Sequence, residues 1–111
     1  MTQSNNAQQS MNWHLANAHN LELSGGFVKT NEIKKGHRVL LSNGWYATMM
    51  DNLKGQTRLA MVEGIYTEAG SVYAHDIVAV RDKNNEDLWH LVQHTASQKK
   101  LRGWIEEQFN S

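Results

Sequence analysis

The chain has 111 residues, with 11 basic and 11 acidic side chains and a formal net charge of zero. It contains no cysteine, which excludes a disulfide framework, a thiolate nucleophile and a cysteine-based zinc site, and fits a reducing cytoplasm. No apolar run approaches the roughly 20 residues of a membrane-spanning helix, and no signal-peptide pattern is visible. We therefore expect one cytoplasmic domain with a single core and no membrane partner.

The N-terminal segment is rich in polar residues. Residues 1–10 are mostly Gln, Asn, Ser and Thr, a composition typical of a disordered tail. Residues 11–19 contain several apolar side chains and fit either a short helix or an arm laid on the core. A break at Ser24–Gly26 follows. We therefore expect a flexible polar arm over residues 1–26 and a short first strand at Phe27–Thr30.

Short apolar runs separated by turn residues predict a β-meander in the middle of the chain. Arg38–Leu41 and Trp45–Met50 meet at Asn43-Gly44, the strongest local hairpin signal, because both central residues of a type I′ turn need positive φ. Gln56–Glu63 is the third run. A turn is expected at Glu68–Ser71, and further strands are expected at Val72–His75, Ile77–Arg81 and Leu88–Gln93.

The C-terminal segment predicts an amphipathic helix over residues 95–109. Thr95-Ala96-Ser97-Gln98 has the capping-box pattern, in which the Thr hydroxyl accepts from the Gln98 amide and the Gln side chain reaches back. Apolar side chains then recur at helical spacing, at Leu101, Trp104, Ile105 and Phe109. We expect this helix to pack on a β-barrel formed by residues 27–94, with Trp104 and Phe109 covering an open end or side.

The predicted strands have the order and turns of a known small fold. Five to seven short antiparallel strands with tight turns and a terminal helix resemble an SH3-like barrel, and the pattern from Ile33 through Gly36-His37-Arg38-Val39 to Asn43-Gly44-Trp45 resembles the opening of many such barrels, KOW-type modules included. Several segments are also similar to short, mostly uncharacterised proteins of bacteriophages and prophages, namely 43–47, 51–55, 58–60, 70–77 and 94–98. This likeness covers about residues 31–102, and it implies a phage accessory protein in the host cytoplasm and no particular reaction.

Four residues are weak candidates for a metal site. His90 and His94 are four apart, which favours one face of a helix or strand, and His75-Asp76 from a neighbouring strand would add a third imidazole and a carboxylate. No Glu follows His90, so the zinc-protease pattern is absent. Surface histidines or hydrogen-bonded structural histidines are the default interpretation, and we expect no cofactor.

Recognised catalytic patterns are missing. Asp76 beside His75 suggests an acid/base pair, but no nucleophile accompanies it, and the glycines lack the spacing of a phosphate-binding loop. We therefore expect a non-enzymatic protein.

Charge is uneven along the chain although its sum is zero. Residues 29–58 hold six basic and two acidic side chains, whereas residues 59–94 hold two basic and six acidic ones. The first segment predicts a basic face for nucleic acid, with Trp45 and Tyr46 as stacking platforms; its cations are Lys34, Lys35, Arg38, Lys54 and Arg58. The alternative is a solvated surface with compensating cross-strand pairs.

The aromatic residues suggest a different function. Trp45, Tyr46, Tyr66 and Tyr73 fit a groove for an extended peptide, a recognition mode of SH3-like domains. Trp45 and Tyr46 are consecutive and must face opposite sides of a strand, so one of them is expected in the core. The leading hypothesis is therefore a protein-interaction module, with nucleic-acid binding second and a metal-dependent activity third.

The partner of such a module is either a host protein or a second copy of the chain. Trp13 and Leu15 in the N-terminal arm suggest a contact through which a homodimer would form.

Overall fold

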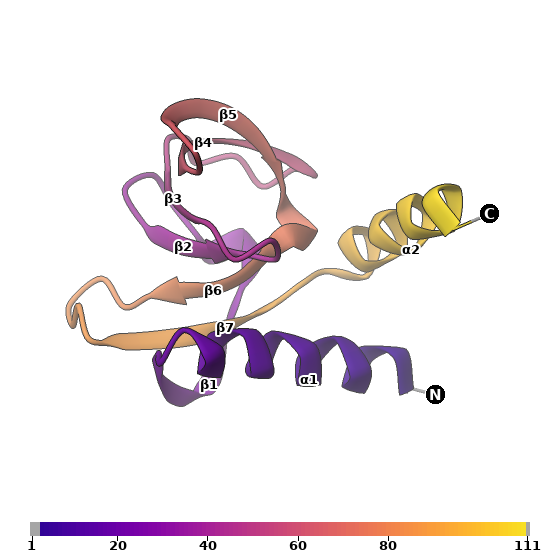
Figure 1. Cartoon of the computed structure of the whole chain (residues 1–111), viewed down its shortest axis with the longest axis horizontal. Coiled ribbons are helices and arrows are strands. Elements are labelled where there is room, and N and C mark those ends of the chain that lie inside the picture. Colours follow the sequence, from indigo (N-terminus) through magenta and orange to yellow (C-terminus); the bar gives the residue numbers. More distant parts are fainter. Residues whose placement is uncertain (1–2, 111) are drawn as a thin grey trace.

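The computed structural model describes residues 3–110, with side chains from residue 11 to residue 108 (Figure 1). Two α-helices flank a series of strands and two single 3-10 turns, labelled η. The elements are α1 (Gln3–Ala18), β1 (Glu22–Lys29), η1 (Thr30–Glu32), β2 (Arg38–Leu41), β3 (Tyr46–Met49), β4 (Thr57–Glu63), β5 (Thr67–Tyr73), η2 (Ala74–Asp76), β6 (Ile77–Arg81), β7 (Leu88–Gln93) and α2 (Ala96–Asn110).

The strands form one mixed sheet. Within the described residues its seven strands follow the order β1-β7-β6-β2-β3-β4-β5. The expected mainly β chain with a C-terminal helix is confirmed. The expectation that all strands are antiparallel is wrong, because β1 pairs in parallel with β7. The sheet is open, with β1 and β5 at its two edges.

The N-terminal segment differs from the expected arm of residues 1–26. The structure has α1 from Gln3 to Ala18 and begins β1 at Glu22, five residues before the expected first strand; residues 1–2 lie outside the described part. Asn20 ends the helix with a φ of 59°, a left-handed conformation that Asn tolerates at a helix C-terminus. The Gly25-Gly26 pair, expected as a break, falls where the β1–β7 register shifts.

The predicted hairpin at Asn43-Gly44 is confirmed, although its turn type is not. Gly44 has a φ of 90° and Asn43 does not have positive φ. The Gly44 N–H donates to Leu41 O, and the Leu41 N–H donates to Trp45 O. This is the three-residue loop in which a type I turn precedes a left-handed glycine.

The predicted turn at Glu68–Ser71 is wrong. These residues lie inside β5, and the reversal of the chain comes earlier, between Glu63 and Thr67. Gly70 and Ser71 favour turns, but seven cross-strand pairs with β4 hold them in an extended conformation.

The core lies on both faces of the sheet. Val39 and Leu41 belong to one apolar cluster, while Leu40 between them belongs to the other, packed with Trp89. Side chains alternate along a strand, so burial on both faces explains the continuous apolar runs of β2 and β6. Leu15, suggested as a dimer contact, packs against the Trp89 cluster of its own chain, whereas Trp13 is exposed.

The α2 helix begins at the predicted capping box. The Gln98 N–H donates to Thr95 Oγ1 at 3.2 Å, and the Thr95 N–H donates to Gln98 Oε1 at 3.0 Å. The helix contacts η2. Trp104 is 57% exposed, so its expected role in covering an open side is wrong, and the Phe109 side chain lies outside the described residues. Neither described helix is long and apolar enough to cross a bilayer.

Candidate functional site

Two adjoining hollows flank Trp45. One has a volume of about 330 Å³ and the other about 280 Å³, and both are lined by Trp45 and Val62. We call them together the Trp45 groove. The first hollow is completed by Ile65, Tyr66, Glu68, Ala69 and Gly70, and the second by Leu41, Ser42, Asn43, Ser71, Val72, Tyr73 and Asp76.

Trp45 is held by the β2–β3 turn and by a glycine. The Trp45 backbone N–H donates to Asn43 Oδ1 at 3.0 Å, and the Trp45 backbone carbonyl accepts from the Leu41 N–H. Its indole occupies space beside Gly64, where a Cβ atom would lie 2.6 Å from Cε3 of the ring. The residue is nevertheless 42% exposed, so the fold fixes an aromatic platform at the surface.

The structure brings together three of the four predicted groove aromatics. Trp45, Tyr66 and Tyr73 line the groove, and the Tyr73 ring stacks on buried His75 with 4.9 Å between centroids. Burial lowers the pKa of His75, against the opposing effect of nearby Asp76. The stacking partner of Tyr73 is therefore held in its neutral form.

Tyr46 is the aromatic that does not reach the groove. Its ring lies 5.8 Å from that of Trp89, its hydroxyl is 3.3 Å from His19 Nδ1, and the Arg38 guanidinium lies 4.9 Å above it. The expected division of Trp45 and Tyr46 between opposite sides of the strand is confirmed. Sequence reasoning missed Ile65, which is an exposed apolar residue. Its position directly after Gly64 was the signal that could have revealed it.

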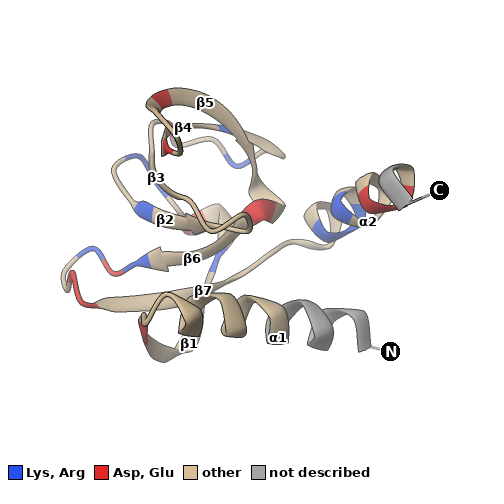
Figure 2. Cartoon of the chain, in the orientation of Figure 1, with Lys and Arg blue, Asp and Glu red and all other residues tan. Residues whose placement is uncertain are grey.

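The electrostatic character of the groove is acidic. Glu68 and Asp76 line it, and none of its described lining residues is Lys or Arg. Glu68 belongs to β5 and Asp76 to η2, and Figure 2 shows acidic positions in red on β5 and on the segment that joins β5 to β6. The Ser42 hydroxyl donates to Asp76 Oδ1 at 2.9 Å, which ties η2 to the β2–β3 turn across the groove.

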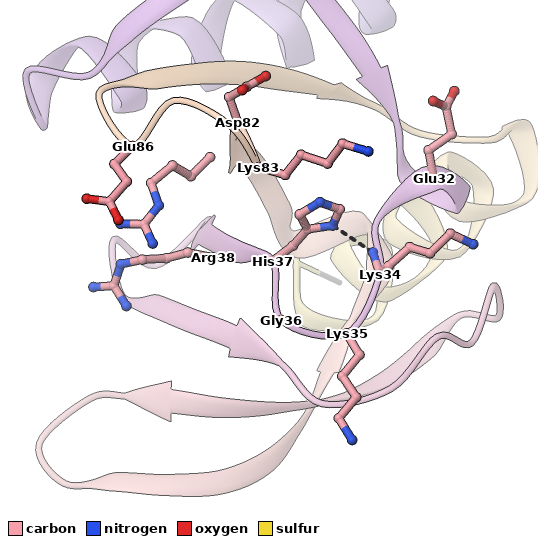
Figure 3. Close-up of a pocket in the computed structure, with 10 residues that line it drawn as sticks. Glu32, Lys34, Lys35, Gly36, His37, Arg38, Asp82, Lys83 and Glu86 are labelled. Carbon is pink, nitrogen blue, oxygen red and sulfur yellow. Dashed lines mark hydrogen bonds between the residues drawn. The ribbon is translucent and has the colours of Figure 1, made fainter.

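The basic residues surround a separate pocket of about 520 Å³, which we call the ionic pocket (Figure 3). Figure 3 shows Lys34 and Lys35 pointing in different directions from consecutive positions. His37 Nδ1 accepts from the Lys34 N–H at 2.8 Å, and burial followed by the charge of Lys83 lowers the pKa of His37. The charged lining residues are Glu32, Lys34, Lys35, Arg38, Arg81, Asp82, Lys83 and Glu86.

The five cations of the predicted basic face do not lie together on one surface. Arg58 is 1% exposed, and it donates to Thr30 O at 2.9 Å, Asn31 Oδ1 at 3.0 Å and Gly55 O at 3.2 Å. Burial lowers the pKa of Arg58. This side chain is therefore a structural tie and has no access to a nucleic acid.

Two other predicted cations are also differently placed. Arg38 makes two contacts with the Glu63 carboxylate, and this hydrogen-bonded partner raises the pKa of Arg38. Lys54 does not line the ionic pocket. Sequence reasoning missed Arg81 and Lys83, which lie in the acidic half of the chain but reach the pocket because β6 pairs with β2.

The four weak metal candidates are not brought together. His94 is buried, and its Nε2 donates to Ile77 O at 2.8 Å. Burial, the largest effect, lowers the pKa of His94 to about 4. His90 has different partners, Asp76 lines the groove, and His75 is buried against the Tyr73 ring. Within the described residues, no group of three or more His, Cys, Asp or Glu side chains is placed to hold a metal ion.

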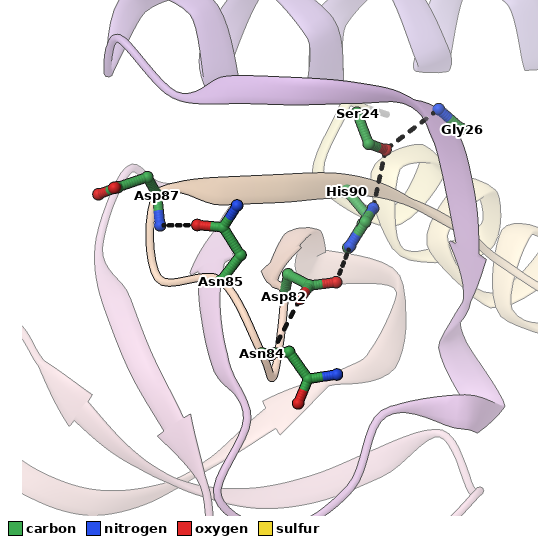
Figure 4. A network of polar contacts seen from close by, with 7 residues as sticks. All are labelled: Ser24, Gly26, Asp82, Asn84, Asn85, Asp87 and His90. Atoms are coloured by element: carbon green, nitrogen blue, oxygen red, sulfur yellow. Dashed lines mark hydrogen bonds and ion pairs between the residues drawn. The ribbon is translucent and has the colours of Figure 1, made fainter.

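His90 instead joins Ser24 and Asp82 in a polar network (Figure 4). His90 Nε2 is 2.8 Å from Asp82 Oδ1, and Nδ1 is 2.8 Å from Ser24 Oγ. The carboxylate can only accept, so Nε2 donates to Asp82, and a hydrogen bond joins Nδ1 to the Ser24 hydroxyl. This hydrogen bond from His90, followed by that of the Asn84 N–H, lowers the pKa of Asp82.

The network resembles a nucleophile–base–acid arrangement. The Gly26 N–H, which lies two residues after Ser24, donates to Ser24 Oγ at 3.2 Å, so both hydrogen bonds of this oxygen stay within the protein. We interpret the network as a tie between β1 and the β6–β7 connection.

Two surfaces therefore stand out, the Trp45 groove and the ionic pocket. The groove combines exposed rings, a concave shape and acidic groups, whereas the pocket contains charged groups of both signs. Comparisons with protein-family models, with curated proteins and with solved structures gave no match, so the functional argument rests on these two surfaces.

Proposed function

We propose that the chain is a non-enzymatic protein-interaction module whose Trp45 groove binds an extended segment of a partner protein. The observation that carries this proposal is the gathering of Trp45, Ile65, Tyr66 and Tyr73 around one concave surface. Ile65 and Tyr66 are 86% and 77% exposed. Contiguous apolar patches of this kind mark interaction sites, and aromatic side chains are the usual anchors of binding energy.

The topology of the central strands supports the same proposal. The five strands β6-β2-β3-β4-β5 are neighbours in that order, and η2 connects β5 to β6. We propose that they form an SH3-like unit, extended by β7 and β1, because this order and connection resemble that fold. SH3 domains bind extended peptides in aromatic-lined grooves. The phage origin, the cytoplasmic location and the choice between host and self partners stay predictions.

The test is a display selection of random peptides on the wild-type chain, followed by fluorescence polarisation with the enriched peptides. Trp45→Ala removes the central ring of the groove, and we expect binding to weaken at least about tenfold. Trp104→Ala is the matched control, since it removes another exposed tryptophan ring, on α2 and outside the groove lining, and should leave affinity unchanged. Selected peptides that bind Trp45→Ala as well as wild type would contradict the proposal.

A second candidate function is nucleic-acid binding, favoured by the ionic pocket. Four cations, Lys34, Lys35, Arg81 and Lys83, line this pocket in addition to the Glu63-paired Arg38. Clustered cations bind phosphate backbones with a strong dependence on salt. Glu32 and Glu86 on the same lining oppose this attraction.

A gel shift with mixed DNA and RNA at low and high salt tests this candidate. We expect the paired substitutions Lys35→Glu and Lys83→Glu to abolish the shift, because they reverse charge on both sides of the pocket. Lys54→Glu, outside the pocket, is the control. The absence of any shift at low salt would remove the hypothesis.

A further inference from the structure

The free edge of the sheet carries unpaired backbone groups next to the Trp45 groove. β5 is the terminal strand and pairs with β4. In β4, the Leu59 N–H donates to an Asp51 carboxylate oxygen and the Leu59 carbonyl accepts from the Met50 N–H. Both groups therefore face β3. Antiparallel ladders alternate between bonded and non-bonded pairs, so Leu59 and its partner Ser71 form a non-bonded pair.

Ser71 must then direct its own N–H and C=O away from β4. The alternation of the ladder gives Thr67 and Ala69 the same outward orientation. At the opposite edge of the sheet, β1 carries an irregularity between Leu23 and Phe27, and such bulges protect an edge from pairing. The register of β5 with β4 runs over all seven residues without a shift, so β5 is a regular and unprotected edge.

The groove follows this edge. One hollow is lined by the consecutive residues Glu68, Ala69 and Gly70, and the other by Ser71, Val72 and Tyr73. Consecutive side chains point to opposite faces of a strand. These six residues include both alternating sets, so the groove reaches the edge of β5, while Val62 and Trp45 extend it over the neighbouring face of the sheet. Figure 1 shows β5 as the outermost strand of this part of the sheet.

We infer that a lysine- or arginine-containing partner segment binds in the Trp45 groove by pairing with β5 as an eighth strand. This inference rests on the proposed function and specifies how that function is performed. The backbone of the segment bonds to the outward groups of Thr67, Ala69 and Ser71, and its side chains on one face pack against Trp45. Main-chain pairing of this type supplies affinity, while alternate side-chain pockets supply specificity.

Two features define the chemistry of the segment. Glu68 and Asp76 give the groove an acidic lining without a described cation, which matches Lys or Arg at alternate positions. Gly70 leaves the middle of the strand bare, since a Cβ atom there would meet only Val62 Cγ2, at 4.0 Å. A glycine inside a strand often marks the close approach of another backbone, and this space suits a β-branched side chain.

The same charges argue against a second copy of the chain as the occupant. Pairing β5 with β5 would bring two copies of Glu68 and Asp76 to one interface, where charges of the same sign repel each other. The segment therefore belongs to a different protein with the opposite charge.

The probe for the test is the labelled peptide acetyl-Lys-Val-Lys-Val-Lys-Val-Lys-amide, measured by fluorescence polarisation against the full chain. We expect it to bind wild type and to lose at least about tenfold in affinity when Glu replaces Lys. Ser71→Pro removes an outward N–H while leaving the β4 ladder intact, and should weaken binding by at least about tenfold. Ser71→Thr keeps the N–H and is the matched control.

Backbone methylation of the probe provides a test that does not depend on folding of the Pro variant. One peptide carries N-methyl groups on its Val residues and another on its Lys residues. In a strand added to β5, only alternate N–H groups face the edge, so one methylated peptide should lose binding and the other should keep it. Amide exchange at Ala69 and Ser71 should also slow at least about tenfold when the unmodified probe binds.

The outcomes separate this inference from the proposed function. Strand pairing would be wrong if binding is lost in Trp45→Ala but is unaffected by Ser71→Pro and by either methylation. The groove proposal would then stay in place. If the probe fails to bind wild type at millimolar concentration while peptides selected by display do bind, the proposed lysine- or arginine-containing chemistry of the segment is overturned. A dimer in sedimentation velocity that Ser71→Pro dissociates would identify a second copy as the occupant.

Discussion

The indole ring of Trp45 fills the space that a side chain on Gly64 would need. A Cβ atom on Gly64 would lie 2.6 Å from Cε3 and 2.7 Å from Cη2 of the ring, distances that non-bonded atoms do not adopt. Gly64 does not have positive φ, so its role is to leave room and not to supply an unusual backbone conformation. The surface position of the groove aromatic thus depends on a residue without a side chain.

Gly64→Ala should therefore displace Trp45. We expect the free energy of unfolding to fall by about 1–3 kcal/mol, the usual cost of overpacking, together with a changed tryptophan fluorescence and weaker peptide binding. Urea denaturation and emission spectra measure these effects. Gly103→Ala is the control, because a Cβ atom on this helical glycine meets open space and should stabilise α2 by about 1 kcal/mol. Equal effects of the two substitutions would contradict the packing argument.

Arg58→Met should destabilise the fold through lost hydrogen bonds. The substitution keeps an apolar stem but leaves the buried Thr30 carbonyl and the Asn31 amide oxygen without this donor, at a cost of about 2–4 kcal/mol. Arg58→Lys should also destabilise, since an ammonium group does not reproduce the planar fork of donors. Lys54→Met, at an exposed position, should change stability by less than about 0.5 kcal/mol. Urea denaturation of all three distinguishes a structural arginine from a surface cation.

Acidification should destabilise the chain through His94. Burial lowers the pKa of this imidazole from 6.5 to about 4 in the folded state, with smaller contributions from Arg102, His75 and Lys99. Between these values the unfolded chain binds more protons than the folded one, so stability falls as the pH drops from 6.5 to 4. The loss is on the order of 3 kcal/mol, and His94→Gln should flatten the dependence. Thermal denaturation across this range, with an NMR titration of His94, provides the measurement.

Thr95→Ala should remove the N-terminal cap of α2. The Thr95 hydroxyl accepts from the Gln98 N–H, and loss of such a cap costs about 1 kcal/mol. Lys100→Ala, at an exposed position of the same helix, is the control and should change stability by less than about 0.5 kcal/mol. A Thr95→Ala variant with wild-type urea denaturation would show that the cap contributes nothing.

Local signals in the sequence predicted local structure. The Asn43-Gly44 hairpin and the capping box at Thr95–Gln98 depend on residues a few positions apart, and both are present. The details that failed depend on distant partners. Gly70 and Ser71 were expected in a turn because of their propensities, but pairing with β4 places them in a strand.

The candidate site shows the same division between local signals and distant partners. Trp45, Tyr66 and Tyr73 were suggested together with Tyr46 because aromatic residues line the peptide grooves of SH3-like domains, and the structure places these three around the Trp45 groove. Arg58 was assigned to a basic face because the acceptors that bury it lie 27 and 28 residues earlier, at Asn31 and Thr30. No local pattern reveals such a tie, and counting charges along the chain treats a buried guanidinium as a free one.

The parallel pairing of β1 with β7 has a consequence for biosynthesis. Glu22 pairs with Leu88, which is made 66 residues later, so a nascent chain on the ribosome carries β1 long before its neighbour exists. Forming this contact closes a long loop, which slows folding. Leu15, Leu21 and Leu23 finally pack against the cluster that contains Trp89, so their burial is incomplete until β7 emerges. Premature termination before Leu88 would therefore release a polypeptide whose N-terminal segment exposes apolar side chains and is prone to aggregation.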